Sequence, residues 1–305
     1  MKKGSFLICF VGLMVLLGCA SAGDVDTGIH GPEVAYLPRH FTFQRVAIAA
    51  SGNSVYQDSS NRYNLYISIT GLRGDFTTII IPTEINGRRV VAINNEAFEE
   101  KNITSVTMPE GLFIGGRAFR NNEIDEIIIP RGTRIGTAAF AGNNLSKVTF
   151  SEGVITIGES AFARNNLTEL TIPDSVTSIG ADAFSENILD TIVIPFELFF
   201  NRGIALTAFG DNEISNILFK DRGQISFLHF IQALTILEES RVIEQQQRTS
   251  DGFYQSNLIR YRNNPAMLAD ITREYERNTA ERMQEWDRKA LELAILFNSI
   301  GIPLN

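Results

Sequence analysis

The sequence predicts a repeat solenoid with an N-terminal β cap and a C-terminal α-helical region. Six Ala-Phe dipeptides recur in the middle of the 305-residue chain, and their phenylalanines lie 21, 21, 22, 22 and 25 residues apart. These phenylalanines are Phe98, Phe119, Phe140, Phe162, Phe184 and Phe209. A period in the twenties, with one apolar set per copy, is typical of stacked repeats in which each turn contacts its neighbours. Solenoids usually act through an extended surface, which favours a binding role over a buried catalytic pocket.

The first 18 residues predict a signal peptide. Two lysines precede the apolar run 6–17, which is long enough for a signal-peptide core and too short to span a bilayer as a helix. Leu-Leu-Gly-Cys at residues 16–19 resembles the bacterial lipobox, in which the cysteine becomes the lipidated first residue of the mature protein. The resemblance implies lipidation at Cys19 and a membrane contact through acyl chains. The alternative is ordinary secretion, with Cys19 as an incidental thiol.

Cysteine content and charge narrow the classes of function. The other cysteine, Cys9, lies inside the signal peptide, so the mature chain has no pair for a disulfide and must gain its stability from packing. The formal net charge is -8 and no long basic run occurs. This balance argues against binding of nucleic acid, or of an anionic membrane, through a basic face.

Two segments lead from the signal peptide to the repeats. Residues 19–40 have few periodic apolar positions and several glycines, which predicts a flexible tether. Residues 41–75 alternate apolar and polar side chains on both sides of Gly52-Asn53, which predicts two strands around a turn. We expect these strands to cap the array, because the first repeat would otherwise expose its apolar end. The repeats then occupy residues 76–220.

The repeats align around the pattern Ile-Gly-x-x-Ala-Phe. The first copy has Asn94 in place of the glycine, and asparagine tolerates positive φ better than most residues, so we expect left-handed backbone at this position. Asparagine also stands three residues after the phenylalanine in five copies, where its amide can satisfy buried backbone groups. These asparagines are Asn122, Asn143, Asn165, Asn187 and Asn212. Because they recur with the core, we expect a structural role for them.

Each copy also predicts a short strand with alternating faces. An apolar-x-x-apolar-x-apolar pattern, usually followed by proline, comes after the asparagine position. With Val106 and Met108 pointing inward, two columns of side chains point outward. The first is Thr78, Ser105, Glu126, Lys147, Glu169, Thr191 and Asn216. The second is Ile80, Thr107, Ile128, Thr149, Thr171, Val193 and Leu218.

The second column is unusually apolar and β-branched, and two explanations are open. Threonine, valine and isoleucine have a high propensity for β-strands, which alone could explain the column. Contiguous apolar side chains on an exposed sheet also favour a strip that binds a partner. The candidate binding face consists of Glu126, Ile128, Lys147, Thr149, Glu169, Thr171, Thr191 and Val193.

One stretch of the array carries a specific family resemblance. Residues 170–185 read Leu-Thr-Ile-Pro-Asp-Ser-Val-Thr-Ser-Ile-Gly-Ala-Asp-Ala-Phe-Ser, which is similar to the consensus of the BspA-type, or treponemal-type, leucine-rich repeat. The resemblance covers about residues 66–219. It implies a leucine-rich-repeat fold and adhesion to host proteins, for example extracellular-matrix components, or attachment to other bacteria.

The C-terminal region, 221–305, has a different pattern. Apolar residues at helical spacing predict a helix from Ser226, as N-cap, to about Gln247, ended by residues 249–252. A second helix is expected from Pro265 to Phe297. On its solvent side, Glu285 with Lys289 and Arg277 with Glu281 are spaced for ion pairs. The two helices either cap the last repeat or form a pair that binds a partner or itself.

The sequence predicts no enzyme, metal site or cofactor. The histidines His30, His40 and His229 stand alone, without a second histidine or cysteine at ligand spacing. No phosphate-binding glycine loop or nucleophile elbow occurs, since the array glycines recur once per repeat.

Together these features predict a lipid-anchored bacterial protein of the cell envelope. The principal hypothesis is a surface-exposed lipoprotein of the outer membrane that acts as a protein-binding module or adhesin through its repeat sheet. Its partner would be a host extracellular-matrix protein or another bacterial surface protein. The alternative is a periplasm-facing structural or assembly scaffold that docks through its C-terminal helices. The sequence leaves the face of the membrane open.

Overall fold

The computed structural model describes residues 34–35, 38–48, 55–56, 65–201, 203–220, 222–260 and 264–302. The predicted signal peptide, Cys19 and the Gly52-Asn53 turn lie outside these residues, as does most of the tether. All described residues belong to one compact unit, Pro32–Asn305. No helix in the described part of the chain combines the length and apolar character needed to cross a membrane.

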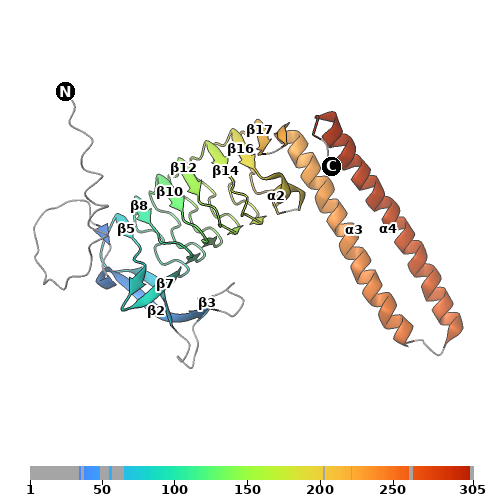
Figure 1. Ribbon diagram of the computed structural model, residues 1–305, viewed down its shortest axis with the longest axis horizontal. Helices are drawn as coiled ribbons and strands as arrows, with labels where there is room; N and C mark the ends of the chain where they lie inside the picture. Colours follow the sequence, from blue (N-terminus) through green and yellow to red (C-terminus); the bar gives the residue numbers. More distant parts are fainter. Residues whose placement is uncertain are drawn as a thin grey trace, which may run out of the picture. The chain divides into compact units, whose positions relative to one another are not determined.

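One strand from each turn contributes to a face that runs along the array (Figure 1). We call these the front strands: β5 (Thr78–Ile80), β8 (Ser105–Thr107), β10 (Glu126–Ile129), β12 (Lys147–Phe150), β14 (Glu169–Thr171), β16 (Thr191–Ile194) and β17 (Asn216–Phe219). They pair in parallel within three groups, β5 with β8, β10 with β12, and β14 with β16 and β17. The ladder is therefore interrupted between β8 and β10 and between β12 and β14, within a fully described stretch.

A second parallel ladder, made of two-residue strands that precede the Ala-Phe dipeptides, also pairs neighbouring turns. It contains β9 (Phe113–Ile114), β11 (Arg134–Ile135), β13 (Thr156–Ile157) and β15 (Ser178–Ile179). It continues from β7 (Arg88–Ile93), which also pairs with β6 (Glu84–Ile85) in a hairpin. At the other end, Ile204 adds a single bridge to Ile179. This second ladder is continuous from β7 to β15, so it also joins the turns between which the front strands are not paired.

The N-terminal end of the array is covered by strands, as the alternation in residues 41–75 predicts. The 3-10 helix η1 (Pro38–His40) leads into β2 (Phe41–Ile48), which pairs antiparallel with β4 (Tyr66–Leu72). In turn, β4 pairs in parallel with β7. The short strand β3 (Val55–Tyr56) pairs with the end of β2, and β1 (Val34–Ala35) pairs with β5. The first repeat is therefore extended by strands at both of its ladders.

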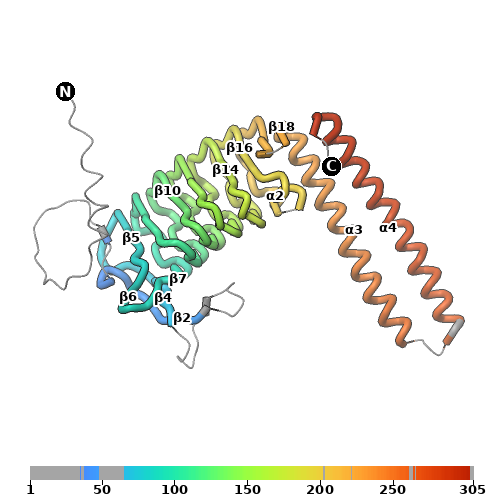
Figure 2. Tube along the Cα trace, in the orientation of Figure 1, coloured from blue at the N-terminus to red at the C-terminus, as the bar shows by residue number. Residues whose placement is uncertain are grey.

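The six Ala-Phe phenylalanines form one buried column through the stacked turns, whose trace is drawn in Figure 2. Neighbouring rings stack with centroids 5.0 to 5.8 Å apart. Phe41 of β2 meets the first ring edge-on at 6.4 Å, and Phe230 meets the last at 6.3 Å. Burial of one phenylalanine contributes roughly 1.5 to 3 kcal/mol, so the column is a principal source of stability.

The asparagine column has the structural role expected of it. In Asn165, the side-chain oxygen accepts the backbone N–H of Leu145 at 3.0 Å, while the amide nitrogen donates to the carbonyls of Phe140 and Phe162 at 3.0 Å. The same bonding recurs at Asn143, Asn187 and Asn212. Each amide therefore ties two consecutive turns together through otherwise unpaired backbone groups.

The expectation of left-handed backbone at the glycine position is wrong. The residues with positive φ lie two positions later, at Arg117, Ala138, Ser160 and Asp182, with φ of 53 to 58°. The glycines are required by close approach instead. A Cβ on Gly158 would lie 2.6 Å from the carbonyl carbon of Gly136 in the preceding turn. The pattern therefore marks contact between the backbones of neighbouring turns.

The C-terminal end is covered by an antiparallel pair of helices, which we call the helical hairpin. After the short helix α2 (Phe196–Phe200) and strand β18 (Gly223–Ser226), the hairpin consists of α3 (Phe227–Arg260) and α4 (Pro265–Ser299). Phe230 of α3 and Phe297 of α4 both contact Phe199, at 5.4 and 5.8 Å between ring centroids. The base of the hairpin therefore caps the array, and the predicted fold class is confirmed.

The predicted end of the first helix at residues 249–252 is wrong, because α3 continues to Arg260. The hydroxyl of Thr249 donates to the carbonyl of Gln245, and Asp251 accepts a hydrogen bond of 2.7 Å from Tyr275 of α4. Ser226 does bond the start of the helix, where its hydroxyl oxygen accepts the backbone N–H of His229. Local turn residues were thus overridden by contacts with α4 that the sequence pattern does not reveal.

Candidate protein-binding site

The front strands direct alternate side chains into the array and hold the two outward columns on its surface. In β10, Ile127 and Ile129 are buried while Glu126 and Ile128 are exposed. The pairing aligns equivalent residues of neighbouring turns, so that Glu126 lies beside Lys147 and Ile128 beside Thr149. This alternation follows from the two-residue period of a strand.

All eight residues of the candidate binding face lie on the outward side of the front strands. The structure brings them together as two sets of four, one on β10 and β12 and the other on β14 and β16. Six of the eight are exposed, and Thr191 and Val193 are half-buried. The two sets lie on consecutive turns but are separated by the ladder interruption between β12 and β14.

A groove of about 490 Å³ lies across the other interruption, between β8 and β10. Its outward-facing lining is Ser105, Thr107, Glu126, Ile128, Lys147 and Thr149. Met108 and Pro130, at the ends of their strands, complete part of the wall. Ile128 is the apolar centre of this lining, with 65% of its surface exposed.

The groove also includes two outward-facing residues of β8 that are not part of the candidate binding face. Ser105 and Thr107 belong to the outward columns, but only the structure places them in the groove with Ile128. Ser105 and Thr107 occupy the same positions in their repeat as Glu126 and Ile128 in the next one, and this equivalence is visible in the sequence. The periodic sequence pattern does not predict where the ladder of front strands is interrupted.

The first outward column alternates in charge at its centre. Glu126, Lys147 and Glu169 occupy equivalent places on consecutive turns, and all three are exposed. Among the described residues none of them has an ion-pair partner. Their charges are thus available to a ligand beside the apolar column, an arrangement that gives orientation as well as contact area.

The Ala-Phe corners of the array carry charges that are already paired. Glu96 pairs with Arg117 of the next turn, and Arg164 pairs with Glu186 at 3.0 Å. Exposed pairs of this kind are worth roughly 0 to 1 kcal/mol and are common on solvated surfaces. They therefore do not single out this edge as a binding site.

The helical hairpin has an unusually polar interior beyond its base. Rings of Tyr254 and Tyr275 stack with centroids 4.1 Å apart, and the Tyr275 hydroxyl donates to Asp251, a hydrogen bond that raises the pKa of Tyr275. Lys289 contacts Glu239 across the pair at 2.5 Å and Glu292 at 3.1 Å. Its hydrogen bonds to these carboxylates raise the pKa of Lys289.

The ion pair expected between Glu285 and Lys289 is not the one formed. Glu285 instead contacts Arg288 at 3.6 Å. The side chain of Lys289 faces α3 rather than solvent, because its carboxylate partner Glu239 lies on that helix. Helical spacing predicts which residues can meet along one helix, but it does not include the competing partner on another helix.

Chemistry-bearing residues do not converge in the described part of the chain. His229 hydrogen-bonds the Ser226 hydroxyl at 2.9 Å at the start of α3. Burial, together with the charge of Arg39, lowers the pKa of His40. Within the described residues, no group of three or more histidine, cysteine or acidic side chains could hold a metal ion. His30 lies outside these residues.

The repeat geometry agrees with a family match over the same segment. Residues 91–214 match the family model described as the BspA type leucine rich repeat region, in six copies. These residues form a BspA-type leucine-rich-repeat region. The resemblance stated for residues 170–185 is thereby confirmed, and the match covers most of the expected range 66–219. A BspA-type region is typically a non-enzymatic scaffold, and its fold suggests a module for interaction with proteins.

Solved structures similar to this chain are also bacterial leucine-rich-repeat proteins. The leucine-rich-repeat protein of T. pallidum, TpLRR, is 23% identical over 52% of this chain and 71% of its own, with a TM-score of 0.43. A leucine rich cell surface protein of Faecalibacterium prausnitzii is 21% identical over 62% of this chain and 57% of its own, with a TM-score of 0.30. Comparison with curated proteins gave no match.

Proposed function

We propose that this protein is a lipid-anchored module of a bacterial cell envelope that binds a partner protein through the front strands. The observation that carries the proposal is the groove across β8, β10 and β12, which places exposed Ile128 among Glu126, Lys147 and Thr149. An apolar centre with charged and hydroxyl groups around it is the arrangement expected of a protein interface.

The BspA-type scaffold supports a protein as the partner. Core positions are repeated in every turn, whereas the outward positions of the front strands differ from turn to turn. Outward residues can therefore change to suit a ligand without altering the phenylalanine and asparagine columns. A rigid surface built in this way loses little conformational freedom when it binds.

Anchoring at Cys19 would place this face close to a membrane. The signal-peptide pattern and the Leu-Leu-Gly-Cys sequence support lipidation, and residues 20–33 would then link the lipid to the array. In this proposal the array faces outward from the outer membrane and acts as an adhesin. Its ligand is a host extracellular-matrix protein or a surface protein of another bacterium.

The alternative proposal is a periplasm-facing scaffold that docks through the helical hairpin. It is favoured by exposed apolar residues on α3 and α4 beyond the base of the hairpin, such as Phe253 and Leu291. In that case the hairpin contacts an envelope complex and the array presents the front strands inside the envelope.

Protease treatment of intact cells separates the two proposals. We expect an external protease to digest the protein while a periplasmic control protein stays intact. Protection of the protein would overturn the adhesin proposal and favour the scaffold. Metabolic labelling with a fatty acid, lost in Cys19→Ser, tests the anchor independently.

Binding to immobilised extracellular-matrix proteins and to bacterial cells tests the face itself. We expect Ile128→Arg to reduce binding at least about tenfold, because it places a charge where the partner would bury an apolar side chain. Ile188→Arg is the matched control, since Ile188 is 57% exposed and does not line the groove. Equal binding by the two variants would contradict the assignment of the face.

A further inference from the structure

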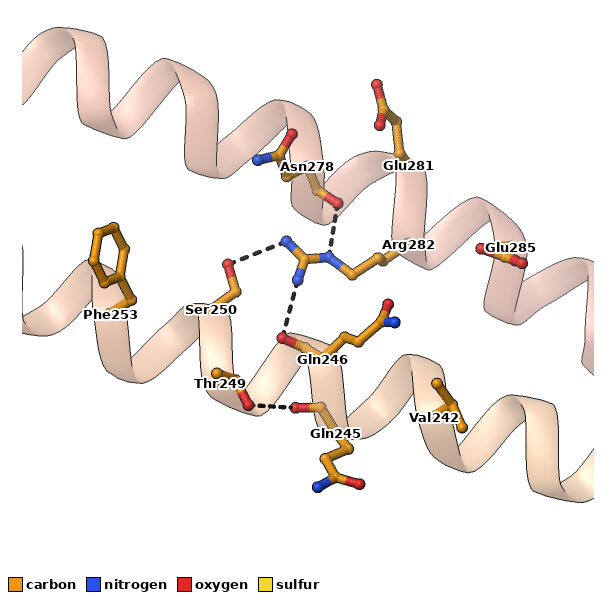
Figure 3. Close-up of a pocket in the computed structure, with 10 residues that line it drawn as sticks. All are labelled: Val242, Gln245, Gln246, Thr249, Ser250, Phe253, Asn278, Glu281, Arg282 and Glu285. Atoms are coloured by element: carbon orange, nitrogen blue, oxygen red, sulfur yellow. Dashed lines mark hydrogen bonds between the residues drawn. The ribbon is translucent and has the colours of Figure 1, made fainter.

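We infer that the helical hairpin carries a second, separate binding site, which takes a basic amphipathic helix of a partner protein. The site is a groove of about 800 Å³ along one side of α3 and α4, drawn in Figure 3. We call it the hairpin groove. It is lined by Val242, Thr249 and Phe253 of α3 and by Asn278, Glu281 and Glu285 of α4, among others.

Two apolar side chains of α3 supply anchor points for an apolar helix face. Val242 is 50% exposed and Phe253 is 71% exposed, and Figure 3 shows them towards opposite ends of the groove. They are eleven positions apart, which is about three turns or 16 Å along the helix. A docked helix presents apolar residues at similar spacing, so it can contact both anchors at once.

Arg282 forms a fixed floor between these anchors. Its guanidinium donates to the carbonyls of Gln246 and Asn278, each at 3.0 Å, and to the hydroxyl of Ser250 at 3.1 Å. The contacts with Gln246 and Ser250 join α4 to α3, whereas Asn278 lies on α4 itself (Figure 3). The one cation in the lining is therefore already hydrogen-bonded to the hairpin, which disfavours an anionic ligand.

The α4 side of the groove presents acidic side chains to the occupant. Glu281 and Glu285 line the groove, and Glu274 lies outside the lining, seven positions before Glu281 on the same side of the helix. Glu274 and Glu281 have no ion pair among the described residues, and Glu285 has only the 3.6 Å contact with Arg288. Lysine or arginine beside the apolar residues of a docked helix would therefore meet the carboxylate of Glu281, which has no ion pair among the described residues, and that of Glu285.

This charge also argues against a second copy of the chain as the occupant. A two-fold contact would place the same acidic side of each groove against its counterpart. The chain as a whole carries a formal charge of -8, so its other surfaces offer little compensation. An antiparallel helix pair that accepts a third helix is an ordinary bundle arrangement, and a foreign basic helix satisfies both the anchors and the carboxylates.

Fluorescence anisotropy with a designed peptide tests the inference. The probe is a labelled helical peptide of about four turns, with leucine along one face and lysine elsewhere. A second peptide has the same leucines and glutamate in place of lysine. Titrated with the chain from Ala20 onward, the lysine peptide should bind at least about tenfold more tightly than the glutamate peptide. Raising the salt from about 50 to 300 mM should weaken its binding.

Variants of exposed residues locate the site without disturbing the core. We expect Phe253→Ser and Glu281→Lys each to weaken lysine-peptide binding about tenfold. Met283→Ser and Glu276→Lys are the matched controls, because both residues are exposed and neither lines the hairpin groove. Helical circular dichroism should be unchanged in all four.

Three outcomes would overturn the inference. The first is equal binding of the two peptides, and the second is equal loss in the groove and control variants. The third is a concentration-dependent dimer, seen by sedimentation, that Phe253→Ser abolishes, since the occupant would then be a second copy. Ile128→Arg should leave peptide binding unchanged, so failure of this site and failure of the front-strand proposal can be distinguished.

Discussion

The BspA-type array and the helical hairpin bury their side chains in opposite ways. In the array, one phenylalanine per turn lies in the column that runs from Phe98 to Phe209, and every ring is buried. In the outer part of the hairpin, the helices meet through the hydrogen bonds of Gln247 with Thr279 and of Tyr275 with Asp251, while Phe253 is exposed. The array therefore gains stability from repetition, and the hairpin from particular polar contacts.

This difference decides what each region can vary. A residue on the front strands can change while the columns behind it stay the same, so the array separates its binding surface from its core. In the hairpin the same helices supply the interhelical contacts and the groove. Arg282, for example, both joins α4 to the carbonyl of Gln246 and forms the groove floor. A change there alters folding and binding together.

Truncation of a phenylalanine in each region should give the largest contrast. We expect Phe140→Ala to lower the free energy of unfolding by roughly 3 to 5 kcal/mol, because it leaves a cavity in the column. Its ring stacks on those of Phe119 and Phe162, 5.2 and 5.4 Å away. Phe253→Ala should change the same quantity by less than about 0.5 kcal/mol, since that ring is exposed.

Urea unfolding followed by circular dichroism measures both changes. The proposed comparison fails if the two variants lose similar stability. It also fails if Phe140→Ala unfolds like the wild-type protein, because the column would then not be a principal source of stability.

The array could be predicted from the sequence because the residue at each repeated position has the same structural role in successive turns. The phenylalanine period predicts the stacking, and the alternation predicts the outward columns. An asparagine in five of the six copies predicts the backbone contacts made by Asn143 or Asn165. Where several turns share a residue type, a packing explanation can be checked against each copy. The eight candidate residues could be placed on one face by the same reasoning.

Features that involve a single pair of residues could not be predicted. The helix continues past Gly252 because contacts such as that of Asp251 with Tyr275 of α4 occur once. The left-handed backbone falls at Ser160 rather than Gly158, because the glycine is needed for the neighbouring turn and not for its own φ. Likewise, the groove depends on a ladder interruption that is not encoded in the repeat pattern.

Replacement of a glycine by alanine should change the free energy of unfolding in opposite directions in the two regions. In Gly158→Ala the new Cβ would lie 2.6 Å from the backbone of Gly136, so we expect a loss of roughly 1 to 3 kcal/mol from the free energy of unfolding. Gly252→Ala should gain about 0.5 to 1 kcal/mol, because it lies within α3 and a Cβ there meets no atom within 4 Å. Thermal unfolding should rank Gly252→Ala above wild type and Gly158→Ala below it.

An equal loss in both glycine variants would indicate that α3 does not continue through Gly252. A gain in Gly158→Ala would contradict the close approach of neighbouring turns. Either result would therefore identify which region has been described incorrectly.

The smallest expected effect tests a position where the array departs from its own pattern. Thr133 is fully buried, and its hydroxyl has no hydrogen-bond partner among the described residues. The equivalent positions are Leu112, Val154 and Val176, which are buried and apolar. We expect Thr133→Val to raise the free energy of unfolding by about 1 kcal/mol, because it removes an unsatisfied hydroxyl while nearly keeping the shape of the side chain.

Thr235→Val in the hairpin is the matched control for that change. Thr235 is exposed, and its hydroxyl already donates to the carbonyl of Ile231 at 2.9 Å. Its replacement should shift the free energy of unfolding by no more than about 0.5 kcal/mol. A destabilised Thr133→Val would mean that the hydroxyl forms a hydrogen bond in solution. A gain in stability confined to Thr133→Val would mean that the apolar residue type shared by the other repeats is the most stable one at this core position. A single departure from the repeated residue type then lowers stability. The hairpin has no repeats, so no such comparison applies to it.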